Sequence, residues 1–457
     1  YLRKGRTKME LYNVLFPYFF LPVFMLIYAL IPAKRRPLLI FAGNLLFISA
    51  ADWRGAAVYF ALLLTAYFSG IAIYNGRAKK DGEKPKLARR RLVLAGNALL
   101  CGAAFLIFAH GGALAPNLPY GLKLFGAGVI AAHMISYLTD VYRGDCEAQT
   151  KFSALAAYTG FFPSLGFGPI LKYKNFRKTF AEPKVTLEKT AEGVRCYITG
   201  LAEYLMIAEP LSRALEDVKK TDFESVRGAP AWLAVIIFCA CFCTTLNGML
   251  NMGRGAALML GFPVKPAFRR RIFKDGVKNS VREMNIPLYE WSRDYIATPL
   301  RRLGGRGGKA AACCGVLVSV TAAVMWYGFT AGWLVCGLIL SAAMIAETAG
   351  AGRKMPKTLR KTLSAAIMFI CGAAAYIPQA AQGRGLLKML NAPAAGTQNG
   401  YIEYLAGISV PLIIMAIFSS NSIIPTIFKR AGTGWYRVAF PVIELVLLMI
   451  CTAYMIY

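Results

Sequence analysis

Histidine is scarce in this sequence of 457 residues, and no two cysteines have the CxxC spacing. The only histidines are His110 and His133. None of the eleven cysteines forms a CxxC pair, and most lie in the middle of apolar stretches, where cysteine acts as a small hydrophobic side chain. Histidine and paired cysteine are the usual ligands of a protein zinc site. The sequence therefore predicts no metal site.

Internal repeats are also missing, because no segment recurs with a period of 20 to 50 residues, and this argues against a solenoid.

Hydrophobic residues make up 57% of the chain, and the core of a soluble protein could not bury so much apolar surface. Runs of about 18 mostly apolar residues are long enough to cross a bilayer as helices. The apolar runs are Leu11–Ile31, Pro37–Ala51, Ala56–Tyr74, Leu92–Ala109, Gly121–Leu138, Phe152–Ile170, Val194–Ala214, Ala229–Leu250, Ala310–Tyr327, Thr330–Ala349, Thr362–Ala381, Tyr404–Ile424 and Tyr436–Tyr457. We therefore expect an all-α polytopic membrane protein, a single domain over residues 1–457 with about 10 to 12 spans.

The net charge of +30 gathers between these runs, above all in residues 75–91 and 265–309. Lysine and arginine concentrate in cytoplasmic loops because positive charge resists translocation, and they also attract anionic lipid headgroups. We therefore predict that both regions face the cytoplasm of a multi-pass protein in the cytoplasmic membrane. Membrane lipids, and not nucleic acid, are then the expected partner of this charge. The alternative is a polyanionic partner.

The first residues conflict with this orientation, because basic residues occur both before the first run and at Lys34–Arg36 just after it. A chain that begins at Met9, with its N-terminus outside, removes the conflict. We therefore interpret residues 1–8 as an N-terminal extension.

The segment FFPSLGFGPI, Phe161–Ile170, is rich in proline and glycine. Pro163 and Pro169 lack a backbone donor and Gly168 relaxes the chain, so a regular helix is not expected. Irregular backbone at membrane depth persists where protein buries it or where it lines a wet cavity. We expect a broken or re-entrant segment on a cavity wall, and the alternative is a kinked packing helix.

A second motif places polar residues inside an apolar run. Asn247, Asn251 and Arg254 are spaced i, i+4 and i+7, so they share one helical face. A polar stripe inside a membrane is costly unless it faces a cavity or a polar partner. The stripe therefore lines a cavity or, alternatively, joins two helices by hydrogen bonds.

A third motif is REMNIPLYEWSRDYIATPLRRLGG, which begins at Arg282. Its apolar residues Met284, Trp291 and Tyr295 follow helical spacing, with charged residues set against them. This pattern is typical of an amphipathic helix that lies at a membrane interface or enters it obliquely.

Taken in this order, the three motifs resemble the membrane-bound O-acyltransferase (MBOAT) family, especially the bacterial branch that acetylates alginate-like polysaccharides or moves D-alanine toward teichoic acid. The resemblance implies a helical bundle with a central cavity. It also implies transfer of an acyl group from a cytoplasmic thioester, acyl-CoA or an acyl-carrier protein, to a hydroxyl of an extracellular polysaccharide or glycolipid. No bound cofactor is then expected. An extracellular SGNH-type or polysaccharide-assembly protein is an expected partner.

The resemblance also assigns site residues. Asn285 matches the family's first polar position, where Asn and His both occur. Trp326 and Gly328 match the second motif, in which Tyr327 stands where the catalytic histidine is expected. We expect Asn285 and Tyr327 to face one internal cavity. The other candidate cavity residues are Trp291, Arg293, Asp294, Asn247, Asn251, Arg254, Pro163, Gly168 and Pro169.

A tyrosine at this position changes the chemistry. The attacking hydroxyl must lose a proton, and histidine, with a pKa of about 6.5, suits that task, whereas a phenol titrates near 10. Tyr327 can instead donate a hydrogen bond to a developing oxyanion. His133 is either an alternative base or a structural hydrogen-bonding residue.

Three functions therefore stay open. The first is a membrane-bound O-acyltransferase with a variant mechanism. The second is a catalytically inactive relative that serves as a scaffold or an acyl passage. The third is a transporter or lipid scramblase that uses the same cavity.

Overall fold

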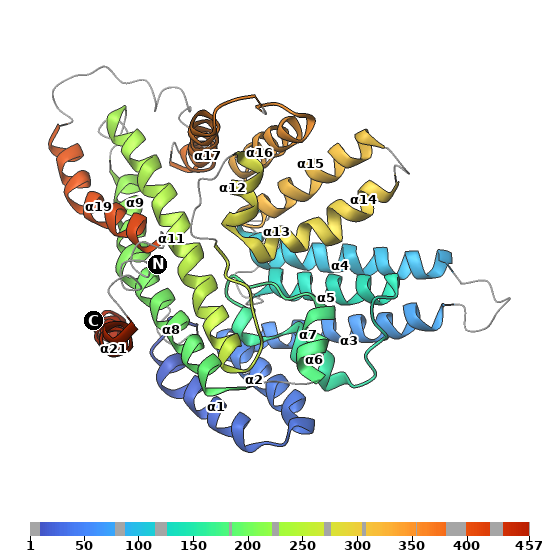
Figure 1. Ribbon diagram of the computed structural model, residues 1–457. Helices are drawn as coiled ribbons and strands as arrows, with labels where there is room; N and C mark the ends of the chain where they lie inside the picture. The colour runs from blue at the N-terminus through green and yellow to red at the C-terminus, as the bar shows by residue number, and fades with distance from the viewer. Residues whose placement is uncertain are drawn as a thin grey trace. The chain divides into compact units, whose positions relative to one another are not determined.

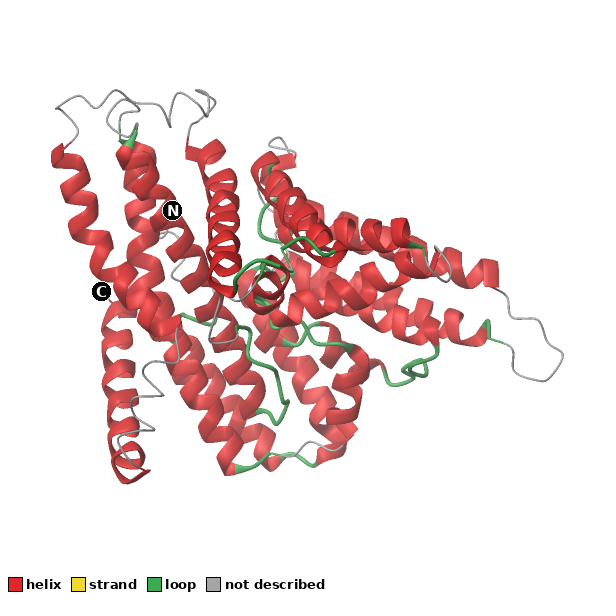
Figure 2. Cartoon of the chain, turned by 45° about the horizontal axis from the view of Figure 1, so that its top comes forward, coloured by secondary structure: helices red, strands yellow, loops and turns green. Residues whose placement is uncertain are grey.

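The computed structural model describes residues 10–77, 87–114, 126–181, 185–221, 228–268, 276–303, 308–352, 354–380, 399–420 and 433–456. Every regular element in these ranges is a helix, which confirms the all-α prediction (Figures 1 and 2). Residues 1–8 and the start proposed at Met9 lie outside the described residues, as do parts of both basic regions.

The chain divides into two compact units. One comprises Tyr1–Tyr197 and Met252–Lys265, and the other comprises Ile198–Asn251 and Pro266–Tyr457. Two helices, α8 (Leu187–Glu203) and α11 (Ala229–Met259), contribute residues to both units. That residues 1–457 form a single domain stays a prediction.

The other helices of the first unit follow one another along the chain. They are η2 (Phe16–Phe20), α1 (Leu21–Leu30), η3 (Ala33–Arg35), α2 (Arg36–Ala51), α3 (Trp53–Asn75), α4 (Leu87–Leu114), α5 (Ala127–Arg143), α6 (Phe152–Thr159), η4 (Phe162–Ser164) and α7 (Tyr173–Ala181). Helix α5 is buried along most of its length and packs against α3, α4, α6 and α7. Figure 1 shows α3, α4 and α5 side by side. Glycines with positive φ bound α5 at both ends, Gly126 at +73° and Gly144 at +91°, where an L side chain would be strained.

The proline- and glycine-rich segment is not a regular helix, as predicted. Helix α6 ends at Thr159, and only the short 3₁₀ turn η4 follows before α7. Buried Asn44 of α2 satisfies backbone groups on both sides of the break: its Oδ1 accepts from the Phe162 N–H at 2.9 Å, and its Nδ2 donates to the Ala156 carbonyl at 3.0 Å. One amide side chain therefore supports the irregular backbone that an apolar environment would otherwise penalise.

The second unit contains the remaining helices. They are η5 (Tyr204–Ala208), α9 (Glu209–Lys220), α12 (Val277–Met284), α13 (Ile286–Ser292), η6 (Arg293–Ala297), α14 (Thr298–Leu303), α15 (Lys309–Met325), α16 (Ala331–Ala349), α17 (Lys357–Ala380), α19 (Asn399–Ser420) and α21 (Thr433–Ile456). Helix α16 packs against both α15 and α17, and α12 also contacts α16 and α17. A buried apolar cluster that includes Val324, Trp333, Cys336, Leu340 and Cys371 fills this group.

Several described helices have the length and composition of membrane spans. Five qualify fully: Trp53–Asn75, Leu87–Phe108, Ala229–Met259, Ala331–Ala349 and Lys357–Pro378. Four shorter apolar helices are Phe16–Leu30, Lys309–Met325, Glu403–Ile417 and Pro441–Ile456. Large apolar side chains are exposed along them, as at Leu92 and Leu99 of α4, each 75% exposed. Such exposure fits a lipid environment and not water. The structure therefore agrees with a polytopic membrane protein, while the total of 10 to 12 spans stays a prediction.

The amphipathic segment predicted from Met284 to Tyr295 differs from the prediction in one respect. Met284 belongs to α12, and the next helix begins only at Ile286, because Asn285 has the extended backbone of a helix cap (φ −150°, ψ 84°). From there α13, η6 and α14 continue without a gap, and Trp291 and Tyr295 are buried. The spacing of the apolar residues gave no sign of the break at Asn285, and the position of this segment at a membrane interface stays a prediction.

Candidate active site

Asn285 lies between α12 and α13, and hydrogen bonds of its side chain hold it in place. Its Oδ1 accepts a hydrogen bond from the Leu288 N–H at 3.2 Å, so the residue caps the N-terminus of α13. This bond fixes the orientation of the amide, because only the oxygen can accept from a backbone N–H. The Nδ2 group therefore points the other way, and it donates to the Tyr327 hydroxyl at 2.9 Å.

Tyr327 lies two residues after the end of α15, in the turn that leads to α16. Its ring meets Phe242 edge-on at 5.0 Å between centroids and packs at 5.9 Å from Trp333. The hydroxyl oxygen accepts from Asn285, so the phenolic hydrogen is left to point elsewhere. Among the described residues no acceptor takes that hydrogen. The site thus presents one oriented O–H donor.

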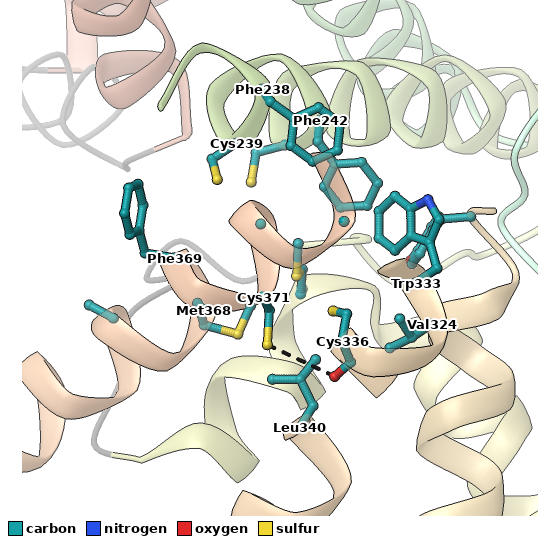
Figure 3. Close-up of a pocket in the computed structure, with 16 residues that line it drawn as sticks. Phe238, Cys239, Phe242, Val324, Trp333, Cys336, Leu340, Met368, Phe369 and Cys371 are labelled. Atoms are coloured by element: carbon teal, nitrogen blue, oxygen red, sulfur yellow. Dashed lines mark hydrogen bonds between the residues drawn. The ribbon is translucent and has the colours of Figure 1, made fainter. Parts of the chain in front are cut away.

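Two cavities meet at Tyr327. The larger has a volume of about 150 Å³ and lies among α11, α12 and α15–α17 (Figure 3). The smaller, of about 50 Å³, is lined by both Asn285 and Tyr327. Met284, Val324 and Leu340 line both cavities. Asn285 and Tyr327 therefore face one cavity from different elements, as we expected, while the place of Phe161–Ile170 on its wall stays a prediction.

The cavity walls are mainly apolar, and four thiols belong to the larger one. Cys239 and Cys243, one turn apart on α11, Cys336 on α16 and Cys371 on α17 all line the larger cavity. Figure 3 shows the thiol of Cys371 directed at the backbone of Cys336, and its Sγ donates to that carbonyl at 3.9 Å. Among the residues that the structure describes, neither lining contains a histidine or a carboxylate. In the described part of the chain no three His, Cys, Asp or Glu side chains gather to hold a metal ion.

Gly328 sets the place of Trp333. A Cβ on Gly328 would overlap the Cδ1 and Nε1 atoms of the Trp333 indole, so only glycine allows the ring to lie against this turn. Trp333 in turn packs at 5.3 Å from Phe242, which completes the aromatic wall around Tyr327. Trp326, the other residue of this motif, lines neither cavity.

Helix α12, which carries Asn285 at its C-terminal end, is anchored at its other end by Glu347 of α16. The carboxylate accepts from the Val277 N–H at 2.6 Å and from the Lys278 N–H at 2.9 Å. A carboxylate at a helix N-terminus satisfies free donors and complements the helix dipole. Sequence reasoning missed Glu347, because nothing in its own neighbourhood signals a contact 70 residues away.

The predicted polar stripe makes hydrogen bonds to α8. In the second unit the Asn247 Nδ2 donates to the Glu203 carboxylate at 2.6 Å, and the Asn251 Nδ2 donates to the Asn247 Oδ1 at 3.2 Å. In the first unit Arg254 pairs with Glu192 at 2.6 Å. Asn247 and Asn251 line neither cavity beside Tyr327, and the geometry matches the joining role that the sequence left open.

Glu203 was missed by sequence reasoning. It is only 6% exposed, at the junction of α8 with the π-helical turn η5. The available signal was a carboxylate inside an apolar run, which is costly unless it has a partner.

The charged pair of the third motif lies on the π-helical turn η6. The Arg293 Nε donates to the Asp294 Oδ1 at 2.8 Å, and this bond raises the pKa of the Arg293 guanidinium. π-Helical turns are rare and often occur at functional sites. Arg293, Asp294 and Trp291 line neither cavity beside Tyr327, so their role in a cavity stays a prediction.

His133 of α5 is fully buried in the first unit, and both of its ring nitrogens have backbone partners. The Nε2 accepts from the Leu171 N–H at 3.1 Å, which leaves the Nδ1 hydrogen to point at the Thr159 carbonyl at 3.3 Å. Thr159 and Leu171 flank the broken segment that contains Pro163, Gly168 and Pro169. This geometry is that of a structural residue that ties the two ends of the break to α5. The side chain of His110 lies outside the described residues.

Comparison with known proteins agrees with the motifs. A model of MBOAT, the membrane-bound O-acyltransferase family, matches residues 148–353, a stretch that includes Asn285 and Tyr327. The chain is 27% identical to the probable alginate O-acetylase AlgI of Pseudomonas syringae over 338 residues, which are 70% of this chain and 63% of that protein. It is 28% identical to the protein of the same description from Pseudomonas aeruginosa over 338 residues, 70% of this chain and 62% of that protein. For Azotobacter vinelandii the identity is 27% over 365 residues, 76% of this chain and 70% of that protein. The chain thus spans less than two thirds of the two Pseudomonas relatives, and the resemblance drawn from the motifs is confirmed.

Proposed function

We propose that this chain, whose sequence matches the membrane-bound O-acyltransferase family, transfers an acyl group from a thioester donor to a hydroxyl acceptor. The observation that carries the proposal is the hydrogen bond from Asn285 to Tyr327 at the junction of two cavities. It joins the two positions that the family resemblance marks as catalytic, although they lie 42 residues apart in the sequence. By that resemblance Tyr327 stands at the position of the family's histidine.

In this mechanism Tyr327 donates its free hydrogen to the carbonyl oxygen of the thioester. Asn285 occupies a lone pair of the phenol and so directs that hydrogen into the cavity. As the acceptor hydroxyl attacks, negative charge develops on the carbonyl oxygen, and a donor that is already oriented stabilises it without reorganising. The tetrahedral intermediate then collapses, the C–S bond breaks, and the ester forms.

The proton of the attacking hydroxyl leaves with the thiol product. Because the described residues of the two linings include no histidine or carboxylate, we assign no protein base to this step. The departing thiolate takes the proton, so the reaction balances as thioester plus alcohol giving ester plus thiol. Lack of a positioned base typically costs on the order of 10²- to 10⁴-fold in rate, so we expect slow turnover.

The donor is acyl-CoA or an acyl-carrier protein on the cytoplasmic side, near the basic residues 265–309. Carriers of this kind are acidic, and basic loops attract them. The acceptor is a hydroxyl of an extracellular polysaccharide or glycolipid, in line with the alginate named for the relatives. The site would then lie in the cytoplasmic membrane, with an SGNH-type or polysaccharide-assembly protein outside it.

The lack of a base in the two linings favours one second candidate, a catalytically inactive relative that serves as a scaffold or acyl passage. Three forms of the purified protein separate the two. With a labelled acyl donor and a panel of hydroxyl acceptors, wild type should transfer label, and Tyr327→Phe should be slower by about 10²- to 10³-fold, the scale of a lost oxyanion donor. Tyr327→His restores a base beside Asn285 and should transfer at least as fast as wild type. If wild type and both variants transfer label only at the uncatalysed rate, the acyltransferase is refuted for the donors used. Equal transfer rates above that background for wild type and Tyr327→Phe would refute the role of the phenol.

A further inference from the structure

The larger cavity beside Tyr327 has the character of a hydrocarbon site. Its wall is built from the aromatic rings of Phe238, Phe242 and Trp333 and from aliphatic and sulfur-containing side chains such as Leu340 and Met368 (Figure 3). None of the described residues that line it is charged. An apolar cavity of this kind stays dry and gains free energy when an apolar group fills it.

Its volume sets the size of the occupant. An engineered protein cavity of about 150 Å³ with an apolar lining binds benzene, a group of six carbons. The cavity here has the same volume, about 150 Å³. An acetyl group carries a single methyl group beyond its carbonyl and would leave most of this space empty. A chain of about four to six carbons matches it.

Small residues on α17 keep the space open. Ala365, Gly372 and Ala375 all face the cavity from this helix. A Cβ on Gly372 would overlap the Sγ of Cys239 on α11, so a side chain there would displace that thiol. Larger side chains at these positions would occupy the space that a ligand chain needs.

We infer that this cavity binds the acyl chain of the donor and selects a chain of about four to six carbons over acetyl. The inference rests on the proposed function, because a thioester whose carbonyl oxygen meets the Tyr327 hydroxyl must direct its chain into a cavity that Tyr327 lines. The smaller cavity, with Asn285 on its wall, is left for the attacking hydroxyl. This specificity differs from the acetyl group in the name of the relatives.

The test uses a series of acyl-CoA donors from two to eight carbons with the full chain in detergent or nanodiscs. Burial of each methylene is worth about fourfold in kcat/KM, so the constant should rise through four to six carbons and fall at eight. Ala365→Leu fills part of the cavity and should lower hexanoyl transfer at least tenfold more than acetyl transfer. The matched control is Ala366→Leu, its neighbour on α17, which is exposed and does not line the cavity. The control should keep the wild-type profile.

The outcomes separate this inference from the proposed function. Transfer from acetyl-CoA with no gain for longer chains, or an equal loss for all donors in Ala365→Leu, overturns the chain site and leaves the acyltransferase standing. No transfer from any donor refutes the acyltransferase, and ligand-induced thermal stabilisation then decides the chain site. A rise in melting temperature that grows with donor chain length up to six carbons, and that disappears in Ala365→Leu, supports the chain site. A rise equal to that produced by free CoA overturns the chain site.

Discussion

Replacing Asn285 by aspartate should reverse the hydrogen bond that orients Tyr327. In the wild type the Nδ2 donates to the phenol oxygen, and no acceptor among the described residues takes the phenolic hydrogen. Aspartate has nearly the same shape but only acceptor oxygens at neutral pH, since its unperturbed pKa is about 3.9. The Tyr327 hydroxyl must then donate to the carboxylate, and its hydrogen no longer points at the substrate.

The expected losses differ between stability and catalysis. Aspartate and asparagine are about equally good N-caps, so the bond from Leu288 survives and the free energy of unfolding should change by less than about 1 kcal/mol. Loss of one oxyanion donor costs on the order of 10²- to 10³-fold in kcat. Asn285→Ala, by contrast, removes the cap, worth about 1 kcal/mol, and leaves the phenol without its donor, worth about 1 kcal/mol more. The two variants therefore separate the role in catalysis from the role in folding.

The assay compares acyl transfer and denaturant unfolding for wild type, Asn285→Asp, Asn285→Ala and the double variant Asn285→Asp, Tyr327→Phe. Because both substitutions remove the same donated hydrogen, the double variant should be no slower than Tyr327→Phe alone. Transfer by Asn285→Asp within twofold of wild type, or faster, would refute the reasoning, because the phenolic hydrogen would then be dispensable or the carboxylate would act as a base.

Two further predictions concern the residues that support the site. Gly328→Ala should displace the Trp333 ring and lower the free energy of unfolding by about 1–3 kcal/mol. The control is Gly407→Ala on α19, where a new Cβ meets nothing within 4 Å, and this change should be neutral or slightly stabilising. Equal effects of the two alanines in a thermal unfolding assay would contradict the packing argument. Glu347→Gln keeps one acceptor oxygen but removes the charge at the start of α12. It should lower the free energy of unfolding by about 1 kcal/mol, less than Glu347→Ala does, and the difference between wild type and Glu347→Gln should shrink at high salt. A loss that salt does not change would show that the charge contributes nothing.

Most of the helices followed from the apolar runs alone. The run Thr330–Ala349 became α16 (Ala331–Ala349), and the proline- and glycine-rich segment was irregular as expected. The run Ala229–Leu250 ended too early, because α11 continues to Met259. Polar Arg254 stays helical there since Glu192 pairs with it, and hydropathy cannot register a partner from another helix.

The site was less predictable from local sequence. Spacing alone does not connect Asn285 with Tyr327 across 42 residues, and the family resemblance supplied that link. Glu203 and Glu347 escaped notice because each acts on a distant segment, through Asn247 in one case and Val277 in the other. Long-range pairs of this kind are fixed by packing, and packing leaves no period in the sequence.

The central claim is that the Tyr327 hydroxyl donates a hydrogen bond to the carbonyl oxygen of the bound thioester. Infrared difference spectroscopy of acyl-CoA labelled with ¹³C at the carbonyl, bound to the full chain without acceptor, measures this bond directly. A donated hydrogen bond polarises the carbonyl, so its stretching band should move to lower frequency on binding to wild type. It should stay near the solution value in Tyr327→Phe and in Asn285→Asp. The same band position in wild type and Tyr327→Phe, with the donor bound in both, would contradict the claim.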